Sequence, residues 1–264
     1  MTESSILWLS TSPSLKWIDL KLISRISQAR PLYLWEFEQE ADQGCDLNVV
    51  LDLLYEYLKL QQDKNHNPIH IVGHGINGVV GALFARKHPE LVRSLTLLSV
   101  GASLSCTWHA QYYAKRSFFE GTQLQTLMYL SQQLFGNAPP YNVRQLASMF
   151  QEDLLQSPIP HSLFDVQALP KGGTKVPTLY CGGEYDTITD AHSVHDWEPW
   201  MKPFDDLWIC PRGRHFFHHE FPMETAHVIE QFHRRLEQRK IGKFMRTDSP
   251  LAASYGSPSM SRIR

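Results

Sequence analysis

The chain has 264 residues, of which 42% are hydrophobic and 20% charged, and its formal net charge is −2. This profile is typical of a soluble globular protein that buries a large core without disulfides. The balanced charge gives no reason to expect a nucleic-acid partner, and no apolar run of about eighteen residues predicts a membrane span. No secretory signal is evident in residues 1–5. Four separated cysteines without CxxC spacing predict reduced thiols and a cytoplasmic protein.

Short apolar runs alternate with longer amphipathic stretches along most of the chain. The runs that predict buried strands are 6–9, 32–35, 69–72, 95–98, 178–181 and 207–210. Helices are expected over 15–26, 46–58, 76–87, 191–201 and 222–238. This alternation predicts an α/β fold, a mostly parallel sheet with helices on both faces.

The rhythm breaks between residues 101 and 171, where helical stretches rich in aromatic residues replace the strands. We interpret 101–171 as a helical cap inserted into a core formed by 1–100 and 172–239. Aromatic residues at helical spacing more often serve packing than binding. If a pocket persists beneath the cap, they make it apolar and suited to a hydrophobic small molecule.

The segment 240–264 differs in kind from the rest of the chain. It is rich in serine and proline, and its five Lys or Arg residues against one Asp give a local charge of +4. Such a composition predicts a disordered basic tail. No membrane partner is expected, although the tail could dock peripherally on a membrane or an acidic partner.

The strand at 69–72 runs into the sequence Gly-His-Gly-Ile-Asn-Gly, and a helix follows at once. This segment resembles the nucleophile elbow of the α/β hydrolases, G-x-S-x-G, whose central residue sits in a strained turn at the top of the sheet. Gly75 takes the place of the nucleophile. The resemblance implies that the Ile76 N–H contributes to an oxyanion hole and that His74 and Asn77 line the pocket.

Two later segments continue this resemblance in the chain order of the family. Asp186 follows the strand at 178–181 and takes the place of the triad acid. His215 follows the strand at 207–210 and takes the place of the triad base. The resemblance covers residues 6–238 and implies the α/β-hydrolase fold. A tight turn in another α/β protein is the alternative, and the Asp186 and His215 segments argue against it.

Three departures from the family pattern bear on activity. Gly75 has no side-chain atom that could attack a carbonyl. The family has a His-Gly pair after its first strand that supplies the second oxyanion donor, whereas this chain has Ser10-Thr11-Ser12-Pro13, and Ser10 is the candidate at that position. Arg214 replaces the glycine before the histidine. Together these departures predict that acyl-enzyme chemistry has been abandoned. Glycine is then favoured at position 75, because it avoids the strain of about 1–3 kcal/mol that the turn imposes on other residues.

Two functional hypotheses remain. The first is a non-catalytic protein that binds a small ligand or a protein partner. The second is an enzyme in which His215 and Asp186 act as a general base on a small apolar ester, lactone or enolisable substrate. Ser99, Ser103 and Cys106 are candidates for a substitute nucleophile, although a buried or capping role is more common for such residues.

No cofactor or metal is predicted. Residues 73–78 fit G-x-G-x-x-G, but the next strand ends without the acidic residue that a dinucleotide site needs. Thirteen histidines include the pair His192 and His195 and a cluster around His215, yet no carboxylate or cysteine stands beside them at a familiar metal-ligand spacing.

Overall fold

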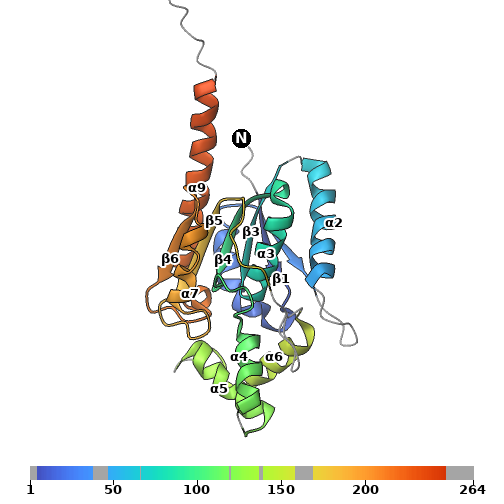
Figure 1. Ribbon diagram of the computed structural model, residues 1–264, viewed down its shortest axis with the longest axis vertical. Coiled ribbons are helices and arrows are strands. Elements are labelled where there is room, and N and C mark those ends of the chain that lie inside the picture. Colours follow the sequence, from blue (N-terminus) through green and yellow to red (C-terminus); the bar gives the residue numbers. More distant parts are fainter. Residues whose placement is uncertain are drawn as a thin grey trace, which may run out of the picture.

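A computed structural model describes residues 5–37, 47–65, 67–118, 120–136, 139–157 and 169–247 (Figure 1). A six-stranded sheet in the order β2-β1-β3-β4-β5-β6 forms its centre, and every neighbouring pair of strands is parallel. The strands are β1 (Ile6–Ser10), β2 (Leu32–Glu36), β3 (Ile69–His74), β4 (Val92–Leu98), β5 (Thr178–Gly183) and β6 (Asp206–Cys210). The strand order reverses beside β1 and β3, which is where open α/β sheets form ligand crevices at the carboxyl ends of their strands.

Helices cover both faces of the sheet because successive side chains of each strand point to opposite sides. On one face Leu7 and Leu9 pack with α2 (Leu47–Asn65) and α3 (Ile76–Lys87). On the other face Ile6 and Trp8 pack with α1 (Leu20–Ile26) and α9 (Pro222–Thr247). Each of these strand side chains is fully buried, which contributes about 1.5–3 kcal/mol per residue.

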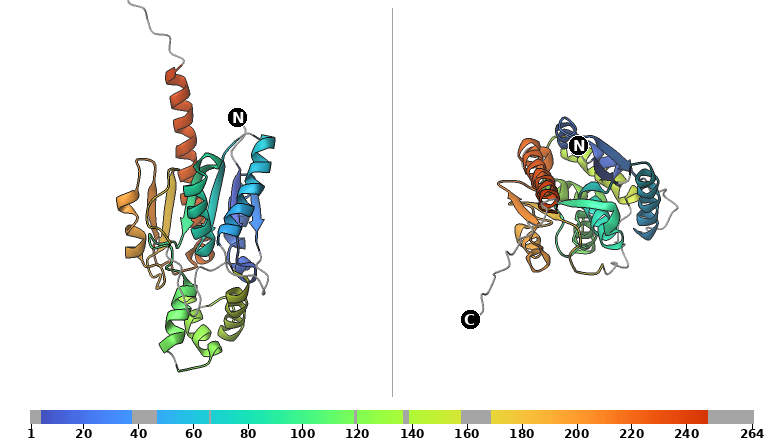
Figure 2. Two further views of the ribbon diagram at one scale, coloured as in Figure 1. Left: turned by 45° about the vertical axis from the view of Figure 1, so that its right-hand side comes forward. Right: turned by 90° about the horizontal axis from the view of Figure 1, so that it is seen from above.

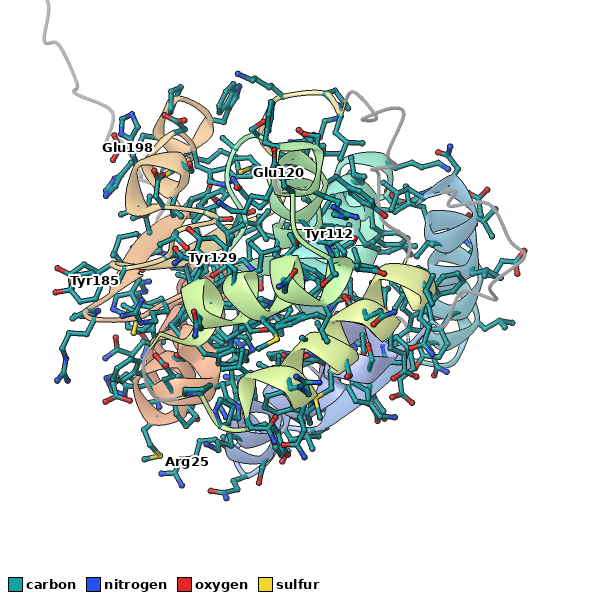
Figure 3. The ribbon with its side chains drawn as sticks, turned by 90° about the horizontal axis from the view of Figure 1, so that it is seen from below. Arg25, Tyr112, Glu120, Tyr129, Tyr185 and Glu198 are labelled. Atoms are coloured by element: carbon teal, nitrogen blue, oxygen red, sulfur yellow. The ribbon has the colours of Figure 1, made fainter. Side chains whose placement is uncertain are left out.

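Among the described residues, three helices lie between β4 and β5 in the chain and sit together beyond the carboxyl ends of the strands (Figures 1 and 2). They are α4 (Trp108–Phe118), α5 (Gln123–Phe135) and α6 (Val143–Gln156), and Figure 3 views the molecule from their side. A third hydrophobic cluster joins them to the 3₁₀ helix η1 (Pro13–Ile18). They fall within the segment predicted to be a cap, and the limits of that cap stay a prediction.

The helix predicted over residues 15–26 is two helices, η1 and α1, that meet at Asp19. The Asp19 carboxylate accepts hydrogen bonds from Trp8 Nε1 and His218 Nε2, and this buried anchor accompanies the break. Likewise, the helix predicted over 191–201 is α7 (Ala191–His195) followed by η3 (Glu198–Trp200). Helical periodicity alone does not reveal such breaks.

The helix α9 continues to Thr247 and projects past the sheet (Figures 1 and 2). The first residues of the segment predicted to be a disordered tail, 240–247, are therefore helical. Helix propagation costs far less than nucleation, so the turns that dock on the sheet support the turns that follow. The remainder of the predicted tail, 248–264, lies outside the described residues.

Candidate functional site

Gly75 joins β3 to α3 in a sharp turn with φ 51° and ψ −122°, a conformation that strains any residue with a Cβ. Its N–H donates to the Leu98 carbonyl at 2.9 Å, and its carbonyl accepts from the Val79 N–H at 3.0 Å. A Cβ added at Gly75 would meet nothing within 4 Å. The turn therefore has space for a side chain and favours glycine through its backbone angles alone.

His215 and Asp186 form a buried hydrogen-bonded pair, as the sequence predicts for residues that follow β6 and β5. Nδ1 of His215 lies 2.9 Å from Oδ2 of Asp186. The N–H groups of Ile188 and Thr189 donate to Oδ1 of the same carboxylate at 2.8 and 3.1 Å and fix its orientation. Nε2 of His215 is buried and has no hydrogen-bond partner among the described residues. Asp186 therefore orients the imidazole of His215.

His74 holds the backbone of the loop that follows β6 and carries His215, which we call the histidine loop. Its Nε2 lies 3.0 Å from the carbonyl oxygen of His215, and the Ser99 hydroxyl donates to the same oxygen at 2.8 Å. Burial, followed by the neighbouring His218 and His215, lowers the pKa of His74 well below its usual value. A neutral imidazole that donates through Nε2 fits this contact. His74 therefore both borders the site and positions His215.

Asn77 reaches across to the loop that follows β1. Its Oδ1 accepts a hydrogen bond from the Thr11 N–H at 2.7 Å and another from the Thr11 hydroxyl at 2.6 Å. Asn77 is buried in the first turn of α3. Ser10 ends β1, and its carbonyl accepts a hydrogen bond from the Phe37 N–H. The Thr11 N–H, next to the predicted donor Ser10 in the chain, is therefore already paired.

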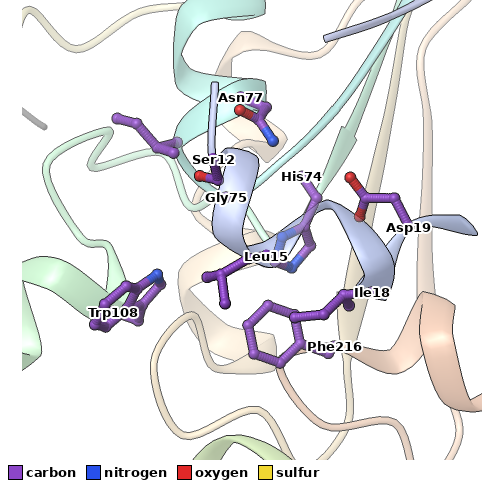
Figure 4. A pocket seen from close by; sticks show the side chains of 10 residues that line it. Ser12, Leu15, Ile18, Asp19, His74, Gly75, Asn77, Trp108 and Phe216 are labelled. Atoms are coloured by element: carbon purple, nitrogen blue, oxygen red, sulfur yellow. The ribbon is translucent and has the colours of Figure 1, made fainter. Parts of the chain in front are cut away.

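A cavity of about 20 Å³ lies at the turn (Figure 4). A volume near 20 Å³ has room for about one water molecule. Side chains from η1, the turn, α4 and the histidine loop fill the rest of the region. The lining residues are Ser12, Leu15, Ile18, Asp19, His74, Gly75, Ile76, Asn77, Trp108 and Phe216. Of the predicted binding residues, His74, Ile76 and Asn77 line this cavity, and Ser12 lines it in place of Ser10.

Asp19 brings an ionisable carboxyl to the cavity wall, and sequence reasoning missed it because no motif surrounds it. Burial raises its pKa to about 6, against the opposing effects of His74, Trp8 and His219. Its two oxygens accept from Trp8 Nε1 at 2.9 Å and His218 Nε2 at 2.8 Å. Both oxygens are thus engaged in holding η1 to the sheet and to α8 (Phe217–Glu220).

A second buried histidine–carboxylate pair joins α4 to α6 and was also missed. His109 Nε2 of α4 lies 2.9 Å from Asp153 Oδ2 of α6, and both side chains are completely buried. Asp153 Oδ1 accepts from Ser157 at 2.8 Å and from Ser14 of η1 at 3.3 Å. This network ties α4 and α6 to each other and to η1.

Arg214 reaches the same group of helices, because its guanidinium lies against Gly136 at the end of α5.

The candidate substitute nucleophiles do not face the dyad as reactive groups. The Ser99 hydroxyl is committed to the His215 carbonyl, and Ser103 is exposed. Cys106 donates its Sγ–H to the Ile188 carbonyl at 3.3 Å, and burial together with Asp186 and Asp190 raises its thiol pKa. A raised pKa favours the unreactive thiol over the thiolate.

Across the described part of the chain, no three His, Cys, Asp or Glu side chains come together in a group that could hold a metal ion. Over the same residues, no helix combines the length and apolar character that a membrane span requires.

Comparison with solved structures identifies the fold. A meta-cleavage product hydrolase from Pseudomonas fluorescens superposes with a TM-score of 0.65 and 14% identity, over 88% of this chain and 91% of the other. A thermophilic esterase from Thermogutta terrifontis gives a TM-score of 0.65 and 15% identity, over 89% and 91%. This chain has the α/β-hydrolase fold. The fold class predicted from the sequence is thereby confirmed.

Two proteins of more than 30% sequence identity are relatives of this α/β-hydrolase-fold chain. The uncharacterized protein alr2406 of Nostoc sp. (strain PCC 7120) is 36% identical over 87% of this chain and 90% of its own. The uncharacterized protein sll0249 of Synechocystis sp. (strain PCC 6803) is 36% identical over 89% and 92%. The chain belongs to one family with these proteins. No family model matches it.

Proposed function

We propose that this α/β-hydrolase-fold protein is a non-catalytic member of its superfamily and acts by binding a protein partner. The observation that carries the proposal is Gly75, which we take to stand at the nucleophile position. Its backbone has the strained turn geometry, yet it offers no atom that could form an acyl-enzyme. Among the described residues, the Ser99 hydroxyl and the Cys106 thiol each donate to a backbone carbonyl, and the remaining candidate, Ser103, is exposed.

The size of the cavity supports a protein partner over a small ligand. Small-molecule sites enclose about 300–1,000 Å³. The cavity at Gly75 is about 20 Å³ because Leu15, Trp108 and Phe216 fill the space beneath the cap. A ligand of ordinary size would have to displace these side chains.

The engagement of Thr11 supports the absence of hydrolysis independently. An oxyanion hole needs two N–H donors free to bind the developing charge, and removal of one costs about 10²–10³-fold in rate. We take the Thr11 N–H, in the loop that follows β1, as the second donor in place of Ser10, and it is paired with Asn77 Oδ1. Loss of the nucleophile and loss of a donor act on the same reaction step.

The proposal is tested by reaction with a fluorophosphonate probe and by turnover of p-nitrophenyl acetate. We expect wild type to be inert in both assays. Gly75→Ser should become labelled at residue 75, because a Cβ there meets no other atom and the dyad is intact. Gly75→Ala is the matched control, since it introduces the same backbone strain without a hydroxyl. Adding His215→Ala to Gly75→Ser should remove the labelling.

Turnover by wild type that disappears in His215→Ala would contradict the non-catalytic proposal. Labelling of wild type at Cys106 or Ser99 would contradict it as well, because it would identify a substitute nucleophile.

A second candidate function is general-base catalysis by the dyad without a covalent intermediate. The observation in its favour is that Nε2 of His215 has no partner in the described structure while Asp186 orients the ring. In this role Nε2 would accept a proton from a water or from an enolisable substrate. A cavity with room for about one water adjoins the same turn.

The two candidates differ in what His215 does. General-base catalysis predicts deuterium exchange into a panel of small ketones and lactones, measured by NMR, that His215→Ala abolishes. Gln at position 215 keeps polarity but cannot take up a proton, so His215→Gln should fail equally. The binding function predicts no exchange with any of the three proteins.

A further inference from the structure

A second cavity lies between α9 and the loop that leads into β6, on the side where α9 leaves the sheet (Figure 1). Its volume is about 60 Å³, against about 20 Å³ for the cavity at Gly75. Residues 203–205 of its lining precede β6, whereas His215 follows β6. The two cavities therefore lie at opposite ends of the sheet. We call this second one the α9 cavity.

Most of the lining of the α9 cavity is apolar. Pro203 and Phe204 contribute from the loop, and Phe232 and Leu236 contribute from α9. Phe232 is buried, whereas Phe204 is 50% exposed, so the cavity runs from the hydrophobic core to the surface. A water molecule needs about 10–15 Å³ on the same measure, so the cavity accepts about four non-hydrogen atoms. That is the size of a small polar group with one or two methylene groups attached.

Arg239 supplies a guanidinium that has no acceptor. Its Cζ lies over the ring of Phe204, 4.5 Å from the ring centroid. No ion pair or hydrogen bond joins Arg239 to another residue that the structure describes. The face of the ring attracts the cation and holds it in place, yet it takes up none of the five N–H groups at the edge of the guanidinium. These groups remain available to a planar acceptor.

The other charged residues around the cavity are already paired. Asp205 is completely buried, and its Oδ2 accepts from the backbone N–H of Lys202 at 2.9 Å and from its Nζ at 2.7 Å. Its Oδ1 accepts from a backbone N–H of β5 at 2.8 Å. Arg235 pairs with Asp206. Each of these carboxylates thus has its own cation, and the charge of Arg239 is left over.

We propose that the α9 cavity binds a small aliphatic carboxylate. The carboxylate group binds to the edge of the Arg239 guanidinium, and the hydrocarbon part packs against Phe232 and Leu236. A guanidinium matches a carboxylate through two parallel N–H···O bonds, and holding Arg239 over Phe204 beforehand lowers the entropy cost of this contact. The single unpaired charge of the site equals the charge of the ligand.

The same features favour a carboxylate over phosphate. Phosphate also fits an arginine fork, but its further negative charge would meet no free cation among the described residues of the cavity. It also has no hydrocarbon part to cover the apolar lining. The inference goes beyond the proposed function, because it concerns the opposite end of the sheet and holds whether or not the dyad reacts.

Titration of the protein with sodium propionate tests the proposal, followed by NMR spectra of the backbone amides at constant ionic strength. We expect saturable shifts in residues 203–206 and 232–239, which surround the cavity. Acetate should bind about four-fold more weakly, since it lacks one methylene group that the lining would bury. Propylammonium, an aliphatic ion of the opposite charge, should give no saturable shift there. Inorganic phosphate should bind more weakly than propionate.

Substitutions at Arg239 test its role in the site. Arg239→Gln should weaken propionate binding by at least about ten-fold in Kd, because a charge-assisted pair of hydrogen bonds is lost. Arg239→Lys should weaken it as well, since lysine keeps the charge but not the planar fork. Arg234→Gln is the matched control, because Arg234 is an exposed arginine of the same helix that pairs with Glu230. Circular dichroism verifies that each variant is folded.

Three results would overturn the proposal. The first is a wild-type protein whose amides around the α9 cavity show no saturable shift with propionate. The second is equal affinity for propionate in wild type and Arg239→Gln. The third is a site that binds phosphate or propylammonium as tightly as propionate, since the carboxylate would then not be what it recognises.

Discussion

The side-chain oxygen of Asn77 accepts hydrogen bonds from both the amide and the hydroxyl of Thr11, residues 66 positions apart in the chain. This contact clamps the loop after β1 to the first turn of α3. It also occupies the N–H of Thr11 in that loop. The side chain at position 77 thus determines whether the Thr11 amide is available to a ligand.

Freeing the Thr11 amide should strengthen any activity restored by a serine at position 75. We expect Gly75→Ser/Asn77→Gly to react with the fluorophosphonate probe at least about ten-fold faster than Gly75→Ser, because a second donor becomes available. Asn77→Asp in the same background is the control, since it keeps an acceptor next to Thr11. Equal labelling rates in all three proteins would show that the Thr11 amide has no part in the site.

Two glycines of the turn should respond differently to alanine. Gly75→Ala should lower the free energy of unfolding by about 1–3 kcal/mol, because φ is 51° but the space is open. Gly73→Ala should cost more, since its Cβ would lie 2.6 Å from the backbone carbonyl carbon of Asn77. Urea denaturation of both variants measures the difference. A smaller loss for Gly73→Ala would contradict the packing described for this turn.

Stability should fall as the pH drops below about 6.5. His218 and His233 are buried, and burial lowers the pKa of each to about 3 from an ordinary 6.5. Between these values the unfolded state binds protons that the folded state does not, so each histidine destabilises the fold by up to about 1.4 kcal/mol per pH unit. Asp19 acts in the opposite direction between its ordinary 3.8 and about 6, because its folded-state pKa is raised. The net slope therefore stays positive below pH 6, at roughly half of what the two histidines would give alone.

His233→Phe isolates one of these contributions. Both ring nitrogens of His233 lack a partner in the described structure, and its ring stacks on His70 at 4.0 Å, so Phe keeps the contact and removes the titration. The free energy of unfolding measured from pH 7 to 5 should fall less steeply in this variant. His227→Phe, at an exposed position of the same helix, is the control. An unchanged slope in His233→Phe would show that His233 is not buried in its neutral form.

The strand rhythm could be predicted from the sequence because it depends on a local pattern. Apolar runs mark the strands, and Asp186 and His215 each follow one of them, so parallel topology brings them to the same end of the sheet. Gly75 was recognised from its neighbours in the turn. These inferences needed no knowledge of distant contacts.

The contacts that close the cavity could not be predicted from sequence in this way. Asp19 meets His218 across 199 positions, and His109 meets Asp153 across 44, with no motif around any of them. A buried polar residue in an amphipathic stretch looks like an exposed one until its partner is known. The size of the cavity likewise depends on side-chain packing between η1, α4 and the histidine loop, which periodicity does not encode.

The pair of His109 and Asp153 should hold the cap closed over the cavity. Asp153→Ala would leave His109 Nε2 buried without its partner and would also release Ser14 and Ser157. We expect a loss of about 3 kcal/mol in the free energy of unfolding, in the range seen when one member of a buried pair is removed.

Glu152→Ala is the control for this loss, because Glu152 is the exposed neighbour of Asp153 on the same helix. A double-mutant cycle with His109→Ala, measured by urea denaturation, gives the coupling between the two side chains. The coupling should account for a large part of the loss, since the two polar groups are completely buried and bonded to each other. If Asp153→Ala costs no more than Glu152→Ala, the cap is held by its hydrophobic cluster alone, and opening of the cavity would then not require this pair to break.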